Sequence, residues 1–424
     1  MRILWHMPIL RRRGCGLSNR ALRFAAALRK SGHAVSFVVA ANKTDIDGDL
    51  IDEMPLEKIT VAPVRQWHWS LQALRRRRMA DRIAQCLDHD HDLFVSCQPE
   101  MVRAYLRLHS RRRIMFVCGG TTLLHESVEA TRHSFANPLS SLSLALDRCL
   151  KHRNEAAGFA AADLAVFDSH QTRRRVMDRY GVKSDKCFTV YGGVDPSIHR
   201  PPSVEERREA RLRLAIDSNA LVLVWTGRLS PEKNLSLLIR ALPRCPRRPE
   251  RLFLVGDGPM RAQLKTLCDE QGVTDIVTFT GEVADVRPYL YAADVFVFPS
   301  KGESFGGSLV EAMACGLPCI ALRSDGRTVR NACEEILGEE NCGVLARADE
   351  PAALAEAMDD LAADPVCRHR LGRLAALRAR ETFSWTQGGR KLNELVTGLF
   401  TNQCTAPTPT ISTRAETSSA LQAG

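Results

Sequence analysis

The chain has 424 residues, of which 45% are hydrophobic and 25% charged, and its formal net charge is +10 at pH 7. This length exceeds what one hydrophobic core usually holds, so two domains are expected. No apolar run approaches the about 20 residues of a membrane-spanning helix, and the opening "MRILWHMPIL" is followed too soon by Arg11 to be a secretory signal. The 14 cysteines show neither metal-site nor disulfide spacing. A cytoplasmic protein with reduced thiols is therefore expected.

The first half of the chain alternates short apolar runs with helical stretches. "RILWHMP" is followed by the helical stretch "NRALRFAAALRKSG" and the apolar run "HAVSFVVA". Later strands are expected at "DLFVSC", "RIMFVC", "DLAVFDS" and "CFTVYG". This alternation predicts a parallel sheet with helices on both faces, which we assign to an N-terminal domain over residues 1–195.

A polar, Pro- and Arg-rich stretch over 196–219 predicts the connection to a second domain, over 220–385. There the alternation resumes with the strand "LVLVWTG", a helix from Pro231, "RLFLVG", the helix "MRAQLKTLCDEQG", "VTFTG", the helix "VRPYLYAA" and "DVFVFPS". A C-terminal helix over 386–401 is expected to return to the first domain, and the Thr-, Ser- and Pro-rich tail 402–424 is expected to be disordered. Because ligands bind at the carboxyl ends of parallel strands, two such domains predict a cleft between them.

Positive charge is concentrated in the first half of the chain. Residues 1–200 hold 32 Lys and Arg against 20 Asp and Glu, a net +12, whereas residues 201–424 hold 27 against 29, a net −2. Arg11, Arg12 and Arg13 lie in the first strand-to-helix loop, at the expected mouth of the cleft. They suit a phosphate-bearing acceptor or an anionic membrane surface, and a merely solubilising basic face is an equal alternative.

The stretch "TGRLSPEKN" predicts a helix that begins directly after a strand. The strand ends at Gly227, Ser230 is a good N-cap, and Arg228 and Lys233 flank the helix start. Two cations beside a helix N-terminus suit a diphosphate, but a capped surface helix with solvated basic residues fits equally well. The following "VGDGP" lacks the dinucleotide fingerprint, and a tight strand-to-helix turn accounts for it.

Two carboxylates flank a glycine-rich loop in "SKGESFGGSLVEAMACGLPCIA". A helix is expected from near Ser308 to Cys315, and Glu311 stands at capping-box spacing from Ser308. No such account covers Glu303, which lies in the loop. Acids beside anion-binding amides suit a ligand that carries both hydroxyls and phosphates, such as a sugar nucleotide.

At this point a family resemblance becomes specific. "TGRLSPEKN", "VGDGP", "ADVFVFPS" and "ESFGGSLVEAMACGLPCIA" resemble, in this order, the C-terminal domain of retaining glycosyltransferases of family 4 (group 1). In the first half "GCGLSNRALRFAAALRKSGHAV", "AADLAVFDSHQTRRRV" and "VYGGVD" resemble family segments, as does the later "FSW". The resemblance implies an α/β chain with the GT-B fold, in which two doubly wound Rossmann-like domains face each other across a cleft.

The resemblance also implies roles for individual residues. Glu303 would contact the transferred sugar, Arg228 and Lys233 the donor diphosphate, and Glu311 the ribose hydroxyls. His125 would replace a sugar-contacting His that the family often has where this chain reads "FVCGG", although a lone His is more often structural. After "RSDG" the chain departs from the family, which usually has a second Gly and then a Glu. The other expected donor contacts are Phe305, Gly306, Gly307, Gly14, Gly16, Gly227 and Gly256, and the other expected acceptor-side residues are Arg11, Arg12 and Arg13.

The expected activity is transfer of a hexose-type sugar, with retention, from a nucleotide-sugar donor to a hydroxyl acceptor. A lipid-linked or cell-envelope glycan precursor is the expected acceptor, as in polysaccharide biosynthesis, and the protein would attach peripherally to the inner face of the membrane. No dedicated metal is expected, because fixed cations and amides can neutralise a leaving diphosphate. No cofactor and no nucleic-acid partner are expected either. The alternatives are a sugar-nucleotide epimerase or phosphorylase of the same fold, or a non-enzymatic basic module that binds nucleic acid or anionic membrane.

Overall fold

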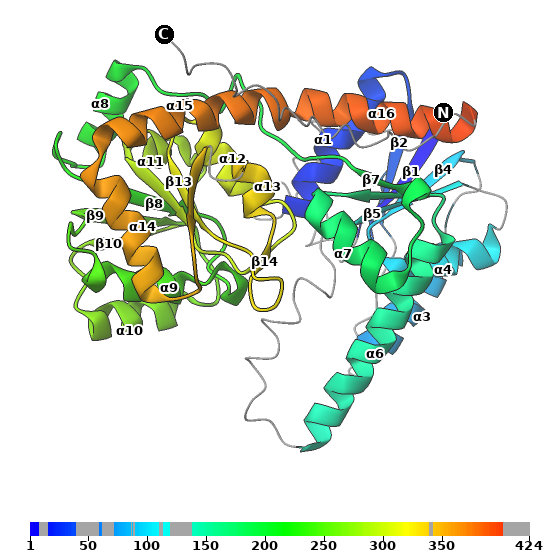
Figure 1. Ribbon diagram of the computed structural model, residues 1–424. Coiled ribbons are helices and arrows are strands. Elements are labelled where there is room, and N and C mark those ends of the chain that lie inside the picture. The colour runs from blue at the N-terminus through cyan, green and yellow to red at the C-terminus, as the bar shows by residue number, and fades with distance from the viewer. Residues whose placement is uncertain are drawn as a thin grey trace, which may run out of the picture.

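The computed structural model describes residues 1–7, 16–39, 59–61, 72–85, 87, 90–109, 113–118, 138–338 and 342–401. Two α/β lobes lie side by side, and helices α15 and α16 run along the top of both (Figure 1). Each lobe contains a parallel sheet covered by helices on both faces. The predicted α/β class with two doubly wound sheets is therefore confirmed.

The first sheet orders its seven described strands β3-β2-β1-β4-β5-β6-β7, all parallel. All four residues of β4 and of β6 are buried, as expected for inner strands covered on both faces. The strands predicted in this half are confirmed, and β3 was not predicted. The elements are β1 (Arg2–Met7), α1 (Gly16–Lys30), β2 (Ala34–Val39), β3 (Ile59–Val61), α3 (Gln72–Gln85), β4 (Leu93–Ser96), α4 (Pro99–Leu108), β5 (Arg113–Cys118), α6 (Pro138–Ala161), β6 (Leu164–Phe167), α7 (His170–Tyr180), a 3₁₀ turn (Ser184–Lys186) and β7 (Cys187–Thr189).

The second sheet orders its six described strands β10-β9-β8-β11-β13-β15. Its strand order reverses direction between β8 and β11, the switch point at which ligands bind in such sheets. The predicted strands and most of the predicted helices are confirmed. The elements are α8 (Val204–Arg213), β8 (Val222–Thr226), α9 (Leu235–Ala241), β9 (Arg251–Val255), α10 (Arg261–Gln271), β10 (Val277–Gly281), α11 (Arg287–Ala292), β11 (Val295–Phe298), β12 (Gly302–Glu303), α12 (Gly307–Ala314), β13 (Cys319–Leu322), β14 (Arg330–Asn331), α13 (Cys333–Leu337), β15 (Gly343–Ala346), α14 (Pro351–Ala363), α15 (Pro365–Thr382), α16 (Trp385–Thr401) and two 3₁₀ turns (Pro231–Lys233 and Leu242–Arg244).

The predicted helix from Pro231 is wrong in its first turn. Residues Pro231–Lys233 form a single 3₁₀ turn, and α9 begins only at Leu235. Asn234 separates the two because its backbone is left-handed, with φ of 54°. Its side-chain amide donates to the Asp349 carboxylate at 2.8 Å, and this bond helps to hold the conformation.

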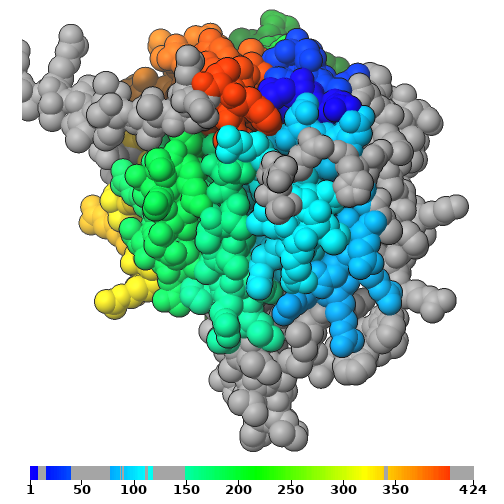
Figure 2. Space-filling view, turned by 90° about the vertical axis from the view of Figure 1, so that its right-hand side faces the viewer, coloured from blue at the N-terminus to red at the C-terminus, as the bar shows by residue number. Residues whose placement is uncertain are grey.

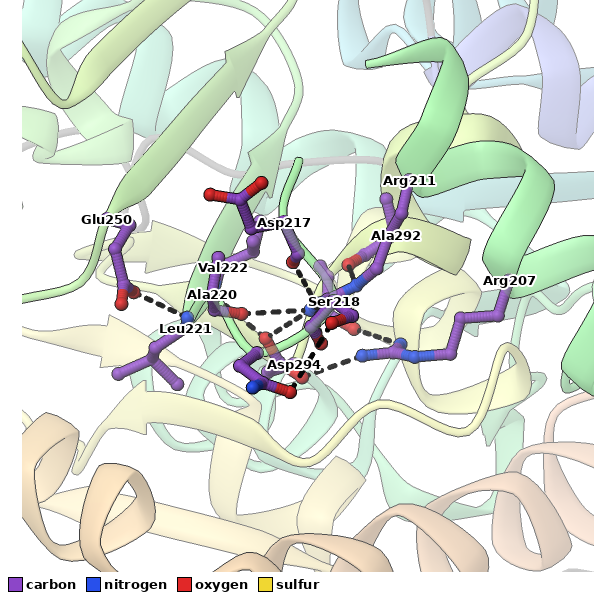
Figure 3. Close-up of polar contacts among 12 residues, drawn as sticks. Arg207, Arg211, Asp217, Ser218, Ala220, Leu221, Val222, Glu250, Ala292 and Asp294 are labelled. Carbon is purple, nitrogen blue, oxygen red and sulfur yellow. Dashed lines mark hydrogen bonds and ion pairs between the residues drawn. The ribbon is translucent and has the colours of Figure 1, made fainter. Parts of the chain in front are cut away.

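Helix α8 lies inside the predicted connection 196–219 and is attached to the second sheet (Figure 3). Arg207 and Arg211 donate to the two carboxylate oxygens of Asp294 at 2.7 and 2.8 Å, and Asp294 also accepts from the Val222 N–H at 2.8 Å. Asp294 directly precedes β11, so one carboxylate joins α8 to two neighbouring strands. Arg211 additionally donates to the backbone carbonyls of Ala292, Asp217, Ser218 and Ala220.

The two chain segments that pass between the lobes are hydrogen-bonded to each other. The Val194 N–H donates to the Phe383 carbonyl at 2.9 Å, and the Trp385 N–H donates to the Val194 carbonyl at 3.2 Å. A Cβ on Gly193 would lie 2.6 Å from the Phe383 oxygen, so this close approach requires glycine. The two crossings therefore form a paired junction between the lobes.

Helix α16 packs on α1 of the first lobe. The rings of Phe24 and Trp385 meet edge to face with centroids 5.7 Å apart, and the His33 imidazole hydrogen-bonds to the Asn393 side chain at 2.7 Å. Figure 2 shows α16 (red) against the residues of α1 (blue) at the top of the molecule. The exact residues at which the domains were predicted to begin and end stay predictions.

We expect Asp294→Asn to lower the free energy of unfolding by about 3 kcal/mol, because it leaves two partly buried guanidinium groups without their counter-charge. Urea titration followed by circular dichroism measures this. Glu209→Gln on the same helix is the matched control: its ion pair with Arg213 is exposed, so a loss below about 0.5 kcal/mol is expected. Equal losses in the two variants would contradict the anchoring role of Asp294.

Candidate functional site

Two loops meet at the switch point of the second sheet, and they bring Lys233 and Glu303 into contact. Lys233 follows β8 and Glu303 follows β11, and the lysine Nζ donates to Glu303 Oε1. The side chains are only 20% and 16% exposed. Burial disfavours the lysine charge, but the Glu303 carboxylate outweighs it and raises the pKa of Lys233. Two of the three predicted catalytic residues thus form one ion pair.

Asp349 joins the two loops from the side of β15. It accepts from the Asn234 amide at 2.8 Å and pairs with Lys301 Nζ at 2.5 Å. The Lys301 N–H also donates to the Glu232 carbonyl at 2.9 Å. Sequence reasoning missed Asp349, because nothing in its neighbourhood marks a residue that lies 115 positions from its partner.

Gly227 and Gly256, which directly follow β8 and β9, allow the backbones of the two loops to approach each other closely. Gly256 has φ of 131°, and a Cβ there would lie 1.9 Å from the Gly227 oxygen. In "VGDGP" a Cβ on Gly258 would likewise lie 2.4 Å from the Leu229 oxygen, so this motif is a tight turn. Arg228, the third predicted catalytic residue, follows Gly227 and is exposed at this edge of the sheet.

The capping-box interpretation of Glu311 is wrong. Helix α12 begins at Gly307, and its N-cap is Gly306 in the left-handed conformation with φ of 80°. Ser308 therefore lies inside the helix and is not its N-cap, because Gly306 occupies that position. Gly307 and Ser308 stand in the first turn of α12, where N–H groups have no helical partner, and Gly307 is exposed.

Glu311 is a half-buried residue whose carboxyl oxygens accept no hydrogen bond from any described residue. Burial raises its pKa to about 7. A ligand hydroxyl that donates to this carboxylate would stabilise its charged form. This favours the ligand-binding interpretation that the resemblance implied.

The first lobe contributes an ion pair to the same loop. Asp168, directly after β6, pairs with Arg20 of α1 inside the protein, where both side chains are less than 10% exposed. The Ser304 hydroxyl donates to the other Asp168 oxygen at 2.9 Å. Gly16, the first residue of α1, is exposed one turn before Arg20. Sequence reasoning missed Arg20 and Asp168, although Arg20 stands at the start of an expected helix and Asp168 at the end of an expected strand.

Glu335 of α13 forms a second bridge between the lobes. Its carboxylate accepts from the backbone N–H groups of His170 and Gln171 at 2.8 and 2.9 Å, and from the Tyr191 hydroxyl at 2.7 Å. The two N–H groups open helix α7, so a carboxylate of one lobe caps a helix of the other. Burial, reinforced by Glu335, raises the pKa of Tyr191, which keeps the phenol protonated as a donor.

The Phe305 ring packs into the junction between the lobes. Its centroid lies 6.2 Å from that of Tyr191 and 5.7 Å from that of Phe383. The ring is therefore buried, and only the loop backbone at this position remains for a ligand. The other predicted residues Gly14, Arg11, Arg12, Arg13 and His125 lie outside the described residues.

One other hollow in the described residues is lined by side chains that are already ion-paired. This hollow of about 150 Å³ between α8 and α11 is lined by Glu206 and Arg287, which already pair with Arg200 and Asp285. Among these residues, no three His, Cys, Asp or Glu side chains are grouped to hold a metal ion. None of the helices that the structure describes is both long and apolar enough to cross a bilayer.

Comparison with known families gives two matches. The model described as "Glycosyltransferase Family 4" matches residues 15–198, and the model described as "Glycosyl transferases group 1" matches residues 220–364. A D-inositol 3-phosphate glycosyltransferase of Streptomyces avermitilis is 33% identical over 239 residues, which are 53% of this chain and 50% of that protein. Its counterpart from Thermomonospora curvata is 33% identical over 56% of this chain and 58% of that protein. The matched region thus spans about half the length of these curated relatives.

Solved structures share the whole architecture at low sequence identity. Sucrose-phosphate synthase from Thermosynechococcus elongatus has a TM-score of 0.77 at 20% identity and covers 95% of this chain and 99% of that one. Anabaena Alr3699/HepE in complex with UDP-glucose has a TM-score of 0.71 at 20% identity, covering 94% and 100%. WaaG, a glycosyltransferase involved in lipopolysaccharide biosynthesis, has a TM-score of 0.70 at 17% identity, covering 93% and 100%. These likenesses show the fold.

Replacing Glu311 with Gln should change how stability depends on pH. Because the pKa of Glu311 is raised to about 7, the folded protein binds a proton here at pH values where the unfolded chain, in which this carboxyl has its ordinary pKa of 4.5, has released it. Because of this carboxyl, the free energy of unfolding decreases as the pH rises from about 4.5 to about 7. The unfolding temperature of the parent minus that of the variant should fall over this range. A difference that is independent of pH would contradict the burial of an unpaired carboxyl.

Proposed function

This chain belongs to the family 4 (group 1) glycosyltransferases, which have the GT-B fold, and on that premise we propose that it transfers a hexose-type sugar from a nucleotide-sugar donor to a hydroxyl acceptor. One observation carries the proposal. The Lys233–Glu303 pair lies at the switch point of the second sheet, beside the first turn of α12. A cation, a carboxylate and helix N–H groups in one place suit a sugar diphosphate.

Each part of the donor has a matching group. Lys233, Arg228 and the N–H groups of Gly307 and Ser308 would hold the diphosphate, whose oxygens replace Glu303 as partner of the lysine. The sugar hydroxyls would then donate to Glu303. The ribose hydroxyls would donate to Glu311, which has no donor within the described residues.

We propose transfer with retention of anomeric configuration. The bond between the anomeric carbon and the diphosphate oxygen breaks, and a bond from the acceptor oxygen forms on the same face. The acceptor proton passes to an oxygen of the departing phosphate. Lys233, Arg228 and the helix N–H groups neutralise the charge that develops there, so the proposal includes no resident metal or other cofactor. Glu303 orients the sugar and is not the nucleophile of a carboxylate pair.

Relatives support a nucleotide donor and a phosphate-bearing acceptor. The HepE structure holds UDP-glucose, the curated relatives are named for inositol 3-phosphate, and WaaG takes part in lipopolysaccharide synthesis. The net +12 of residues 1–200 agrees with an anionic acceptor. We therefore propose a lipid-linked or otherwise phosphate-bearing glycan precursor at an anionic membrane surface.

The test of the donor is a thermal-shift screen with UDP, GDP and their sugar conjugates. A ligand at 100 times its Kd stabilises the folded protein by about 2.7 kcal/mol, so one nucleotide series should raise the unfolding temperature clearly. Glu303→Gln should keep this shift, because Glu303 does not hold the diphosphate, and should lower sugar transfer at least about 10-fold.

Three outcomes, one from the thermal-shift screen and two from the activity assay, would contradict the proposal. No nucleotide shifts the parent, or the variant transfers sugar at the parent rate, or the sugar of the bound donor is epimerised without transfer. The last result would instead identify a sugar-nucleotide epimerase of the same fold.

Replacing Arg11, Arg12 and Arg13 together with Gln should weaken binding to anionic vesicles and use of the acceptor. Each basic residue near such a surface contributes about 1 kcal/mol, so vesicle binding should fall roughly 100-fold for the triple change. Sedimentation with vesicles that contain phosphatidylserine measures it, and the nucleotide-induced thermal shift should be unchanged. Parent-like sedimentation and acceptor kinetics would show that the three arginines are only a solvated face.

A further inference from the structure

Asn331 lies directly beside Glu303 in a short two-stranded sheet. Strands β12 and β14 pair in parallel with Gly302 opposite Arg330 and Glu303 opposite Asn331. The Arg330 N–H donates to the Lys301 carbonyl at 2.6 Å. The backbone that carries Glu303 is therefore attached to the segment that ends in Asn331.

The Asn331 side chain is fully buried, at 0% exposure, and its amide hydrogen-bonds to three backbone groups. Its Nδ2 donates to the carbonyls of Ser300 and Leu322 at 2.9 and 3.1 Å, and its Oδ1 accepts from the Cys333 N–H at 3.1 Å. Both amide hydrogens and one acceptor site are thus in use. Because both Nδ2 partners are carbonyls, the orientation of the amide is determined by its surroundings.

These contacts join the ends of two neighbouring strands. Strands β11 and β13 pair with Phe298 opposite Ala321. Ser300 stands two residues after β11, where the loop to Glu303 departs, and Leu322 is the last residue of β13. One amide therefore connects the root of the Glu303 loop to the sheet.

We propose that Asn331 is a positioning residue that holds Glu303 at the reacting sugar, an inference that rests on the proposed function. The Glu303 carboxylate is restrained by Lys233, but a donor diphosphate takes this lysine as its own partner. The backbone attachment through β12, β14 and Asn331 then remains to fix Glu303 relative to the sheet. This asparagine lies in the segment after "RSDG", where the chain departs from the family pattern.

Only an asparagine side chain supplies both the donors for the two backbone carbonyls and the acceptor for the Cys333 N–H. In Asn331→Asp a carboxylate oxygen would face two carbonyl oxygens, and in Asn331→Ser two buried carbonyls would lose their donor. Either change loosens the root of the loop without removing a group that touches the donor. A displacement of about 1 Å at a reacting group can cost 100-fold in rate.

The decisive experiment is a double-mutant cycle with Glu303→Gln. Asn331→Ser should lower kcat about 30-fold in the parent and change KM for the donor less than about 3-fold, because the diphosphate contacts remain. In the Glu303→Gln background the same change should lower kcat less than about 3-fold, because its effect acts through Glu303. Equal fold-changes in the two backgrounds would overturn the proposal. Asn331→Asp serves as the second variant.

Hydrogen exchange gives a readout that does not need transfer. Peptides that span 300–307 should exchange at least about 10-fold faster in the Asn331 variants, whereas those of β8 should not change. The matched control is Asn154→Asp in the first lobe, a buried asparagine that accepts from Arg103 at 2.9 Å, and it should leave 300–307 as in the parent. Unchanged exchange at 300–307 would overturn the proposal. If the parent itself transfers no sugar, the proposed function fails, and the exchange result still decides whether Asn331 holds the loop.

Discussion

The arrangement of the two lobes depends on carboxylates that reach across the seam between them. Glu335 caps the first two N–H groups of α7 and binds the Tyr191 hydroxyl, and Asp168 binds the Ser304 hydroxyl of the opposite lobe. A helix N-terminus offers unsatisfied donors and a partial positive charge, so a carboxylate satisfies both at once. The carboxyl ends of the two sheets are thereby held facing each other, which is the condition for a shared site.

At this site, charged side chains pair with each other, and groups of a ligand could take the place of either partner. Lys233 and Glu303 neutralise each other at low exposure, and a diphosphate and a sugar hydroxyl offer equivalent partners. Glu311 differs because it is half-buried and accepts no hydrogen bond from the described residues, and desolvation raises its pKa. On the proposed function, these groups would serve both the anionic and the hydroxyl groups of one ligand.

Other buried polar contacts give the site a rigid support. Asp294 attaches the connecting helix α8 to β8 and β11, the strands that deliver Lys233 and Glu303. Asn331 attaches the Glu303 loop to β13, and Asp349 joins that loop to the turn after β8. Each is a single side chain with several backbone or charged partners, so each restrains more than one segment.

The sequence alone determined the two parallel sheets, their strands, the loops that carry Arg228, Lys233 and Glu303, and the helix that carries Glu311, because apolar periodicity and glycine-rich turns are local signals. It misjudged the turn after Pro231, where a left-handed Asn234 interrupts the helix, and the role of Ser308, where Gly306 supplies the N-cap. Only the tertiary structure decided that Lys233 meets Glu303 and that Asp168, Glu335, Asp349 and Asn331 support the loops around them. Their partners lie far away in the chain, and which side chains meet at a sheet edge depends on strand order, which no local pattern records.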